Sequence, residues 1–97
     1  MIIKLSPGRH DLLEPHDYAR LKLQVPAGWS VADIERGLPF GATCSAEHVW
    51  IKEADLRAIA AAGGSESEPL SGMIDKAKKY GFYDEANGTI RVHVEYD

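Results

Sequence analysis

The stretch TIRVHVEY, residues 89–96, alternates apolar and polar side chains and is the clearest indication of the fold. One side carries Ile90, Val92, Val94 and Tyr96, and the other carries Arg91, His93 and Glu95. Successive side chains of a β-strand point to opposite faces, so this period of two is typical of a strand with one buried and one solvated face. The segment therefore predicts a sheet that is covered on one side only.

The remaining elements can be assigned from similar patterns. Strands are expected at Ile2–Leu5, Ala19–Val25 and Ala46–Ile51. Helices are expected at Val31–Leu38, with Ser30 as its cap, and at Glu53–Ala62 and Leu70–Tyr80, where apolar residues recur every three or four positions. The segments Arg9–Tyr18 and Ser65–Pro69 are expected to be loops, and a short extra strand at 82–84 can pair with the last strand through a turn at 85–88.

The resulting order, β-β-α-β-α-α-β, predicts an α+β fold with two layers. We expect a mostly antiparallel sheet of four to five strands, with three helices packed on one face. The 97 residues are expected to form a single α+β domain, 1–97, because this length is near the usual size for one hydrophobic core. The order of the strands within the sheet does not follow from these patterns.

The composition is that of an ordinary globular protein, with 44% hydrophobic and 27% charged residues. The formal net charge of −4 argues against nucleic acid or an anionic membrane as the partner. No apolar run approaches the roughly 20 residues that a bilayer span requires, and the first residues lack the pattern of a signal peptide. Cys44 is the only cysteine, so an intrachain disulfide is excluded. We therefore expect a cytoplasmic protein.

The solvated face of the sheet differs in charge from the chain as a whole. The alternation places on it Lys4, Arg20, Lys22, Gln24, Arg91, His93 and Glu95. The phase of the third strand is ambiguous, but Val49 and Ile51 are the better core pair, which puts His48 and Trp50 on the solvated face. An acidic chain is thus predicted to carry a basic surface with a tryptophan, and interfaces favour aromatic residues and arginine. The alternative interpretation is that these charges serve only solubility.

A second candidate site lies in the predicted loop after the first strand. It contains five possible metal ligands within eight residues, namely His10, Asp11, Glu14, His16 and Asp17. Imidazole and carboxylate groups suit Zn, Ni or Mn, although this spacing matches no established motif. Histidine–aspartate pairs are also common in polar turns, where the aspartate bonds to its own backbone.

These observations favour a non-enzymatic interaction or accessory domain that requires no cofactor. The predicted interaction surface comprises Arg20, Lys22, His48, Trp50, Arg91 and His93, and the partner is either a second copy of the chain or another protein. Two-fold pairing of a basic surface brings like charges together, which is an objection to a homodimer. The alternative is a small ligand-binding or metal-binding protein or enzyme that uses His10, Asp11, His16 and Asp17 with the nearby histidines.

Overall fold

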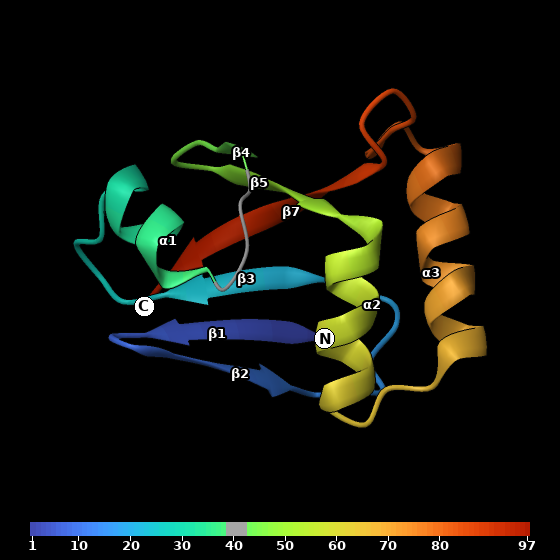
Figure 1. The fold of residues 1–97 in the computed structure, drawn as a ribbon, viewed down its shortest axis with the longest axis horizontal. Helices are drawn as coiled ribbons and strands as arrows, with labels where there is room; N and C mark the ends of the chain where they lie inside the picture. The colour runs from blue at the N-terminus through green and yellow to red at the C-terminus, as the bar shows by residue number, and fades with distance from the viewer. Residues whose placement is uncertain (39–42) are drawn as a thin grey trace.

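Figure 1 shows the computed structural model, which describes residues 1–38 and 43–97. Within these ranges the chain forms seven strands and three helices. The strands are β1 (Ile2–Ser6), β2 (Arg9–Leu13), β3 (Lys22–Val25), β4 (Thr43–Cys44), β5 (His48–Lys52), β6 (Tyr83–Asp84) and β7 (Thr89–Tyr96). The helices are α1 (Val31–Gly37), α2 (Glu53–Ala62) and α3 (Ser67–Lys79).

The strands form one open, mixed sheet in the order β2-β1-β3-β7-β5-β4, and β6 pairs with the first residues of β7. The central strand β3 is parallel to both of its neighbours, β1 and β7, whereas the other pairs are antiparallel. The predicted α+β fold is therefore confirmed, with antiparallel pairs in the majority. β3 lies between β1 and β7, which come from opposite ends of the sequence. Local sequence patterns therefore could not reveal this strand order.

The prediction of a loop at Arg9–Tyr18 is wrong for its first half, because Arg9–Leu13 is the edge strand β2. Pro7 and Gly8 form a tight turn in which Gly8 adopts a φ of 74°, and Ser6 then pairs with Arg9. An edge strand is paired on one side only and tolerates polar residues on both faces. The sequence of β2 therefore lacks the apolar alternation that identified β7.

The strand predicted at Ala19–Val25 begins only at Lys22. The amino group of Met1 donates hydrogen bonds to the carbonyl oxygens of Asp17 and Arg20, both at 2.7 Å. These bonds hold the preceding segment as a loop beside the sheet. Arg20 consequently lies in the loop that precedes β3 and not on a strand.

Two helix boundaries depend on local chemistry. At the start of α1, the Ser30 hydroxyl accepts a hydrogen bond from the Asp33 amide at 3.2 Å, and the Ser30 amide donates to the Asp33 carboxylate at 2.9 Å. This reciprocal pair is a capping box and confirms the predicted cap. α3 begins at Ser67, inside the predicted loop. Pro69 lies in its first turn, where backbone N–H groups have no acceptor within the helix, so the missing N–H of proline costs no hydrogen bond.

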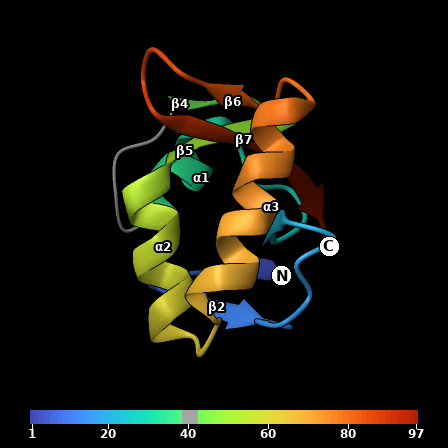
Figure 2. The same ribbon diagram turned by 90° about the vertical axis from the view of Figure 1, so that its right-hand side faces the viewer.

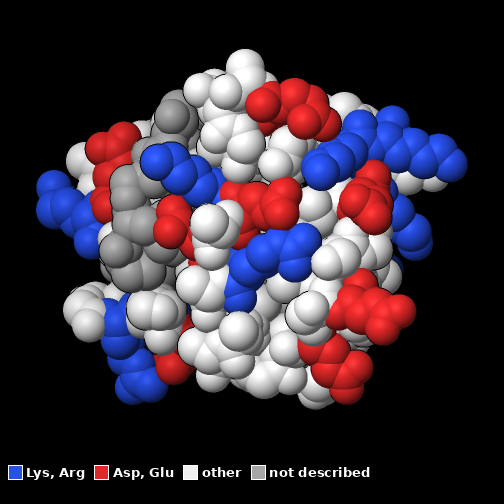
Figure 3. Space-filling view, turned by 45° about the vertical axis from the view of Figure 1, so that its right-hand side comes forward, with Lys and Arg blue, Asp and Glu red and all other residues white. Residues whose placement is uncertain are grey.

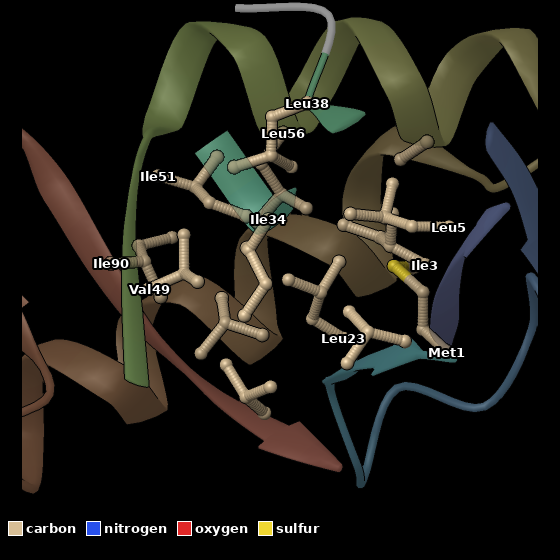
Figure 4. Packing of buried hydrophobic residues seen from close by; sticks show 14 of the residues in the cluster. Met1, Ile3, Leu5, Leu23, Ile34, Leu38, Val49, Ile51, Leu56 and Ile90 are labelled. Atoms are coloured by element: carbon tan, nitrogen blue, oxygen red, sulfur yellow. The ribbon is translucent and has the colours of Figure 1, made fainter. Parts of the chain in front are cut away.

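The core lies between the sheet and the helices. Its buried side chains include Ile3, Leu23, Val49 and Ile51 from the strands, and Ile34 and Leu56 from α1 and α2 (Figure 4). Val92 of β7, Ala60 of α2, and Leu70 and Ile74 of α3 belong to the same cluster. Val49 and Ile51 are both 0% exposed, which confirms the predicted phase of β5. His48 and Trp50 therefore project from the opposite face of the sheet.

The three helices leave that opposite face uncovered. α1 and α2 lie across one face of the sheet, whereas α3 stands at its end, next to α2 and β6 (Figures 1 and 2). None of the helices in the described ranges has the length and hydropathy needed to cross a membrane. The uncovered face, called the open face below, meets α3 at this end of the sheet.

Candidate binding site on the open face

The strand register brings the polar side chains of the open face into rows. Lys22 of β3 lies opposite His93 of β7, which in turn lies opposite His48 of β5. In the next row of the same strands, Arg91 lies opposite Trp50. Residues that share a row are neighbours across the strands, so segments distant in the sequence contribute to one continuous surface.

A hollow of about 510 Å³ opens where these rows meet α3. Its floor is formed by His48, Arg91 and His93, together with Ile90 at the level of the core. One wall consists of Met73, Lys76 and Ala77 of α3, followed by Tyr80 and Phe82, and the opposite wall is the segment 18–22. The volume lies within the range of small-ligand sites, which is about 300–1,000 Å³.

The two walls are held together by hydrogen bonds between the loop before β3 and the start of α3. The Tyr18 hydroxyl accepts a hydrogen bond from the Glu66 amide at 2.8 Å. The Ser65 hydroxyl donates to the carbonyl oxygen of Pro15 at 2.7 Å. The hollow is therefore already formed in the structure, which lowers the entropic cost of binding.

The lining of the hollow, called the basic hollow below, is strongly one-sided in charge. It contains the cations Arg20, Lys22, Lys76 and Arg91, and no aspartate or glutamate among the residues that the structure describes. Lys22 is neutralised by Glu95, whose carboxylate lies 2.9 Å from Nζ. Within residues 1–38 and 43–97, the other three cations form no salt bridge.

This concentration of positive charge in one hollow is unusual for a chain with a net charge of −4. On the side of the molecule shown in Figure 3, acidic and basic residues are interspersed, as on an ordinary solvated surface. The basic hollow is thus a local exception, and clefts lined by one sign of charge concentrate ligands of the opposite sign.

Aromatic rings border the cations. Tyr80 and Phe82 are 65% and 41% exposed, which is high for large apolar side chains. The Arg91 guanidinium lies over the Phe82 ring, 4.5 Å from its centroid, and so remains next to the hollow. Exposed aromatic surface beside unpaired cations is suited to a ligand that has both a negative charge and a planar or apolar body.

The structure brings together most of the surface residues predicted from the sequence. Arg20, Lys22, His48, Arg91 and His93 all line the basic hollow, and Trp50 lies beside it as the cross-strand neighbour of Arg91. The wall residues of α3 and Phe82 were missed. A basic end of the predicted helix was their only signal, and cations are expected there from the helix dipole alone.

The four proposed metal ligands are not brought together. His10 and Asp11 lie on β2, where Asp11 pairs with Arg9 at 3.0 Å. Asp17 accepts a hydrogen bond from the Ala19 amide at 3.1 Å, and His16 contacts the Tyr18 hydroxyl at 3.4 Å. The described part of the chain contains no group of three or more His, Cys, Asp or Glu side chains arranged to hold a metal ion. His48 and His93, with ring centroids 6.0 Å apart, are a pair without a third such ligand in that part of the chain.

Comparisons with known proteins add no constraint, since no protein-family model, curated protein or solved structure matches the chain. A functional assignment therefore depends on the geometry and charge of the basic hollow.

Proposed function

We propose that this protein is an interaction domain that binds an acidic segment of another protein in the basic hollow on its open face. The single observation that carries the proposal is the lining of four Lys and Arg side chains without a described carboxylate, in a chain of net charge −4. Charge complementarity both accelerates encounter and selects the partner. Trp50 and Phe82 supply the rigid aromatic area that protein interfaces favour.

A homodimer through the same surface is less consistent with the charges. A two-fold axis through the basic hollow would place its cations against the same cations of the second copy. Glu95, the acidic residue that the sequence placed on the open face, already pairs with Lys22. The excess of positive charge therefore favours an acidic partner of different sequence.

The extent of the basic surface favours a protein over a nucleic acid. Single-stranded nucleic acids are bound along grooves in which cations follow the backbone over several nucleotides. Here the unpaired cations are gathered around one hollow and do not form such a track. A short acidic segment with one apolar or aromatic residue matches the dimensions better.

The proposal can be tested with a fluorescein-labelled peptide that has two glutamates on each side of one tyrosine. Fluorescence anisotropy should show binding that weakens as salt is added. Arg91→Gln should weaken binding about tenfold or more, because hydrogen bonds to charged groups are among the stronger polar interactions. Lys4→Gln is the matched control, since Lys4 lies on the open face opposite Gln24, outside the hollow.

Three results would contradict the proposal. The first is the absence of binding at low ionic strength, and the second is equal weakening by Arg91→Gln and Lys4→Gln. The third is sedimentation of the protein as a dimer that Arg91→Gln converts to a monomer, which would identify the hollow as a self-association surface.

A further inference from the structure

The number of unpaired cations limits the chemistry of the group that enters the basic hollow. Arg20, Lys76 and Arg91 line the same hollow, and none of them has a salt-bridge partner in the described ranges. A single carboxylate carries one negative charge and would leave most of this positive charge unbalanced. A phosphate monoester carries about −1.5 to −2 at neutral pH and three acceptor oxygens, which is a closer match.

The donors around the hollow also suit a phosphate group. Arginine can present two parallel N–H groups to a phosphate, and the ammonium of Lys76 adds a point charge from the opposite wall. The floor adds the two imidazoles of His48 and His93. The Arg91 guanidinium lies over the Phe82 ring, 4.5 Å from its centroid, and Arg91 has no salt-bridge partner in the described ranges.

The apolar side of the hollow limits what carries the phosphate. Met73 and Ala77 line the α3 wall with the exposed ring of Tyr80, and Phe82 continues that wall. A phosphorylated serine would leave this surface in contact with water, since its side chain is short and polar. An aromatic ring bearing the phosphate would cover it, with the rings packed edge to face or offset.

From these features we infer that the partner inserts a phosphorylated tyrosine into the basic hollow. The phosphate lies among Arg20, Lys76 and Arg91, and the tyrosine ring lies against Tyr80 and Phe82. This inference rests on the proposed function, because it specifies the residue through which the acidic segment is recognised. Phosphorylation of the partner would then raise its affinity for the basic hollow through the added local charge.

The experiment compares three forms of the labelled peptide, in which the central residue is tyrosine, phosphotyrosine or phosphoserine. Phosphotyrosine should bind about tenfold or more tightly than tyrosine, and phosphoserine should lie between them. Arg91→Gln should remove most of the difference between phosphotyrosine and tyrosine, and Lys4→Gln should retain it. Circular dichroism and thermal melting of each variant confirm that the protein remains folded.

The outcomes separate this inference from the proposed function. If the tyrosine and phosphotyrosine peptides bind equally, and both depend on Arg91, the inference fails while the proposed function stands. If neither peptide binds, both fail. Adenosine monophosphate and inorganic phosphate serve as competitors. Displacement of the phosphotyrosine peptide by adenosine monophosphate at a lower concentration than by free phosphotyrosine would show that the hollow takes a nucleotide, and would overturn the assignment to a protein side chain.

Discussion

Substitution of Gly63, the residue that follows α2, by alanine is predicted to destabilise the protein, although the backbone conformation at this position permits a side chain. Its φ of −86° and ψ of 0° are accessible to alanine without strain. At such a position Gly→Ala normally stabilises a protein by about 0.4–1 kcal/mol, because it reduces the freedom of the unfolded chain. Here a Cβ atom would lie 2.3 Å from Cδ2 and 2.9 Å from Cβ of Leu12 on β2.

The contact with the Cβ atom of Leu12 determines the sign of the effect. Rotation of the leucine side chain can move Cδ2 away, but it cannot move Cβ, which is fixed to the β2 backbone. The strand or the end of α2 must therefore shift, and overpacking of this kind costs about 1–3 kcal/mol. Subtracting the entropic gain, we expect Gly63→Ala to destabilise the protein by about 1–2 kcal/mol.

Gly72 provides a matched control in the middle of α3. A Cβ atom there would meet no atom within 4 Å beyond its chain neighbours and the backbone of its own helix, so Gly72→Ala should stabilise the protein by about 0.5–1 kcal/mol. Urea unfolding and thermal melting of both variants measure the difference, and each kcal/mol corresponds to about 4–8 °C for a domain of this size. Equal stabilisation by both substitutions would refute the close contact between β2 and α2. In a Leu12→Ala background, the cost at Gly63 should shrink, because the Cδ2 and Cγ contacts are lost.

Four further substitutions test the two faces of β7, a charged contact and a helix cap. Val92→Asp should unfold the domain, because Val92 is 0% exposed and an unpaired charge there costs several kcal/mol out of the roughly 5–15 kcal/mol of a typical domain. His93→Asp should instead fold and melt normally but lose binding of the acidic peptide, because it adds a carboxylate to the basic hollow. Hydrogen bonds from Arg57, and then from Tyr83, lower the pKa of Glu53, so its contribution to stability is complete above the ordinary glutamate pKa of about 4.3 and is lost as the pH falls through the lowered value. Glu53→Gln should therefore flatten the dependence of urea stability on pH in acid. Ser30→Ala should cost about 1 kcal/mol through loss of the capping box, measured by urea unfolding.

Each of these predictions has an outcome that would contradict it. A folded Val92→Asp variant, or an unfolded His93→Asp variant, would reverse the faces assigned to β7. An acid transition that is the same in the wild type and in Glu53→Gln would show that the bonds from Arg57 and Tyr83 do not persist in solution. An unchanged free energy of unfolding for Ser30→Ala would mean that the hydroxyl does not cap α1.

Local patterns in the sequence determined the elements whose two faces differ in environment. β7 alternates between core and solvent, and α2 and α3 present apolar stripes, because burial of one face requires that periodicity. Ser30 marked the start of α1, and its capping box with Asp33 spans only four residues. The division of the sheet into a core face and an open face followed from the same periodicity, including the orientation of His48 and Trp50.

Tertiary structure alone decided how these elements combine. β2 carries no burial signal because it is an edge strand, and β3 lies between β1 and β7 through contacts that span most of the chain. The basic hollow depends on that arrangement. Arg20 from the loop before β3, Lys76 from α3 and Arg91 from β7 are separated by 15 or more residues, and only the packing of α3 at the end of the sheet places them around one space. Periodicity reports the direction of each side chain relative to its own element, whereas a site formed between elements depends on their relative positions, which no local pattern encodes.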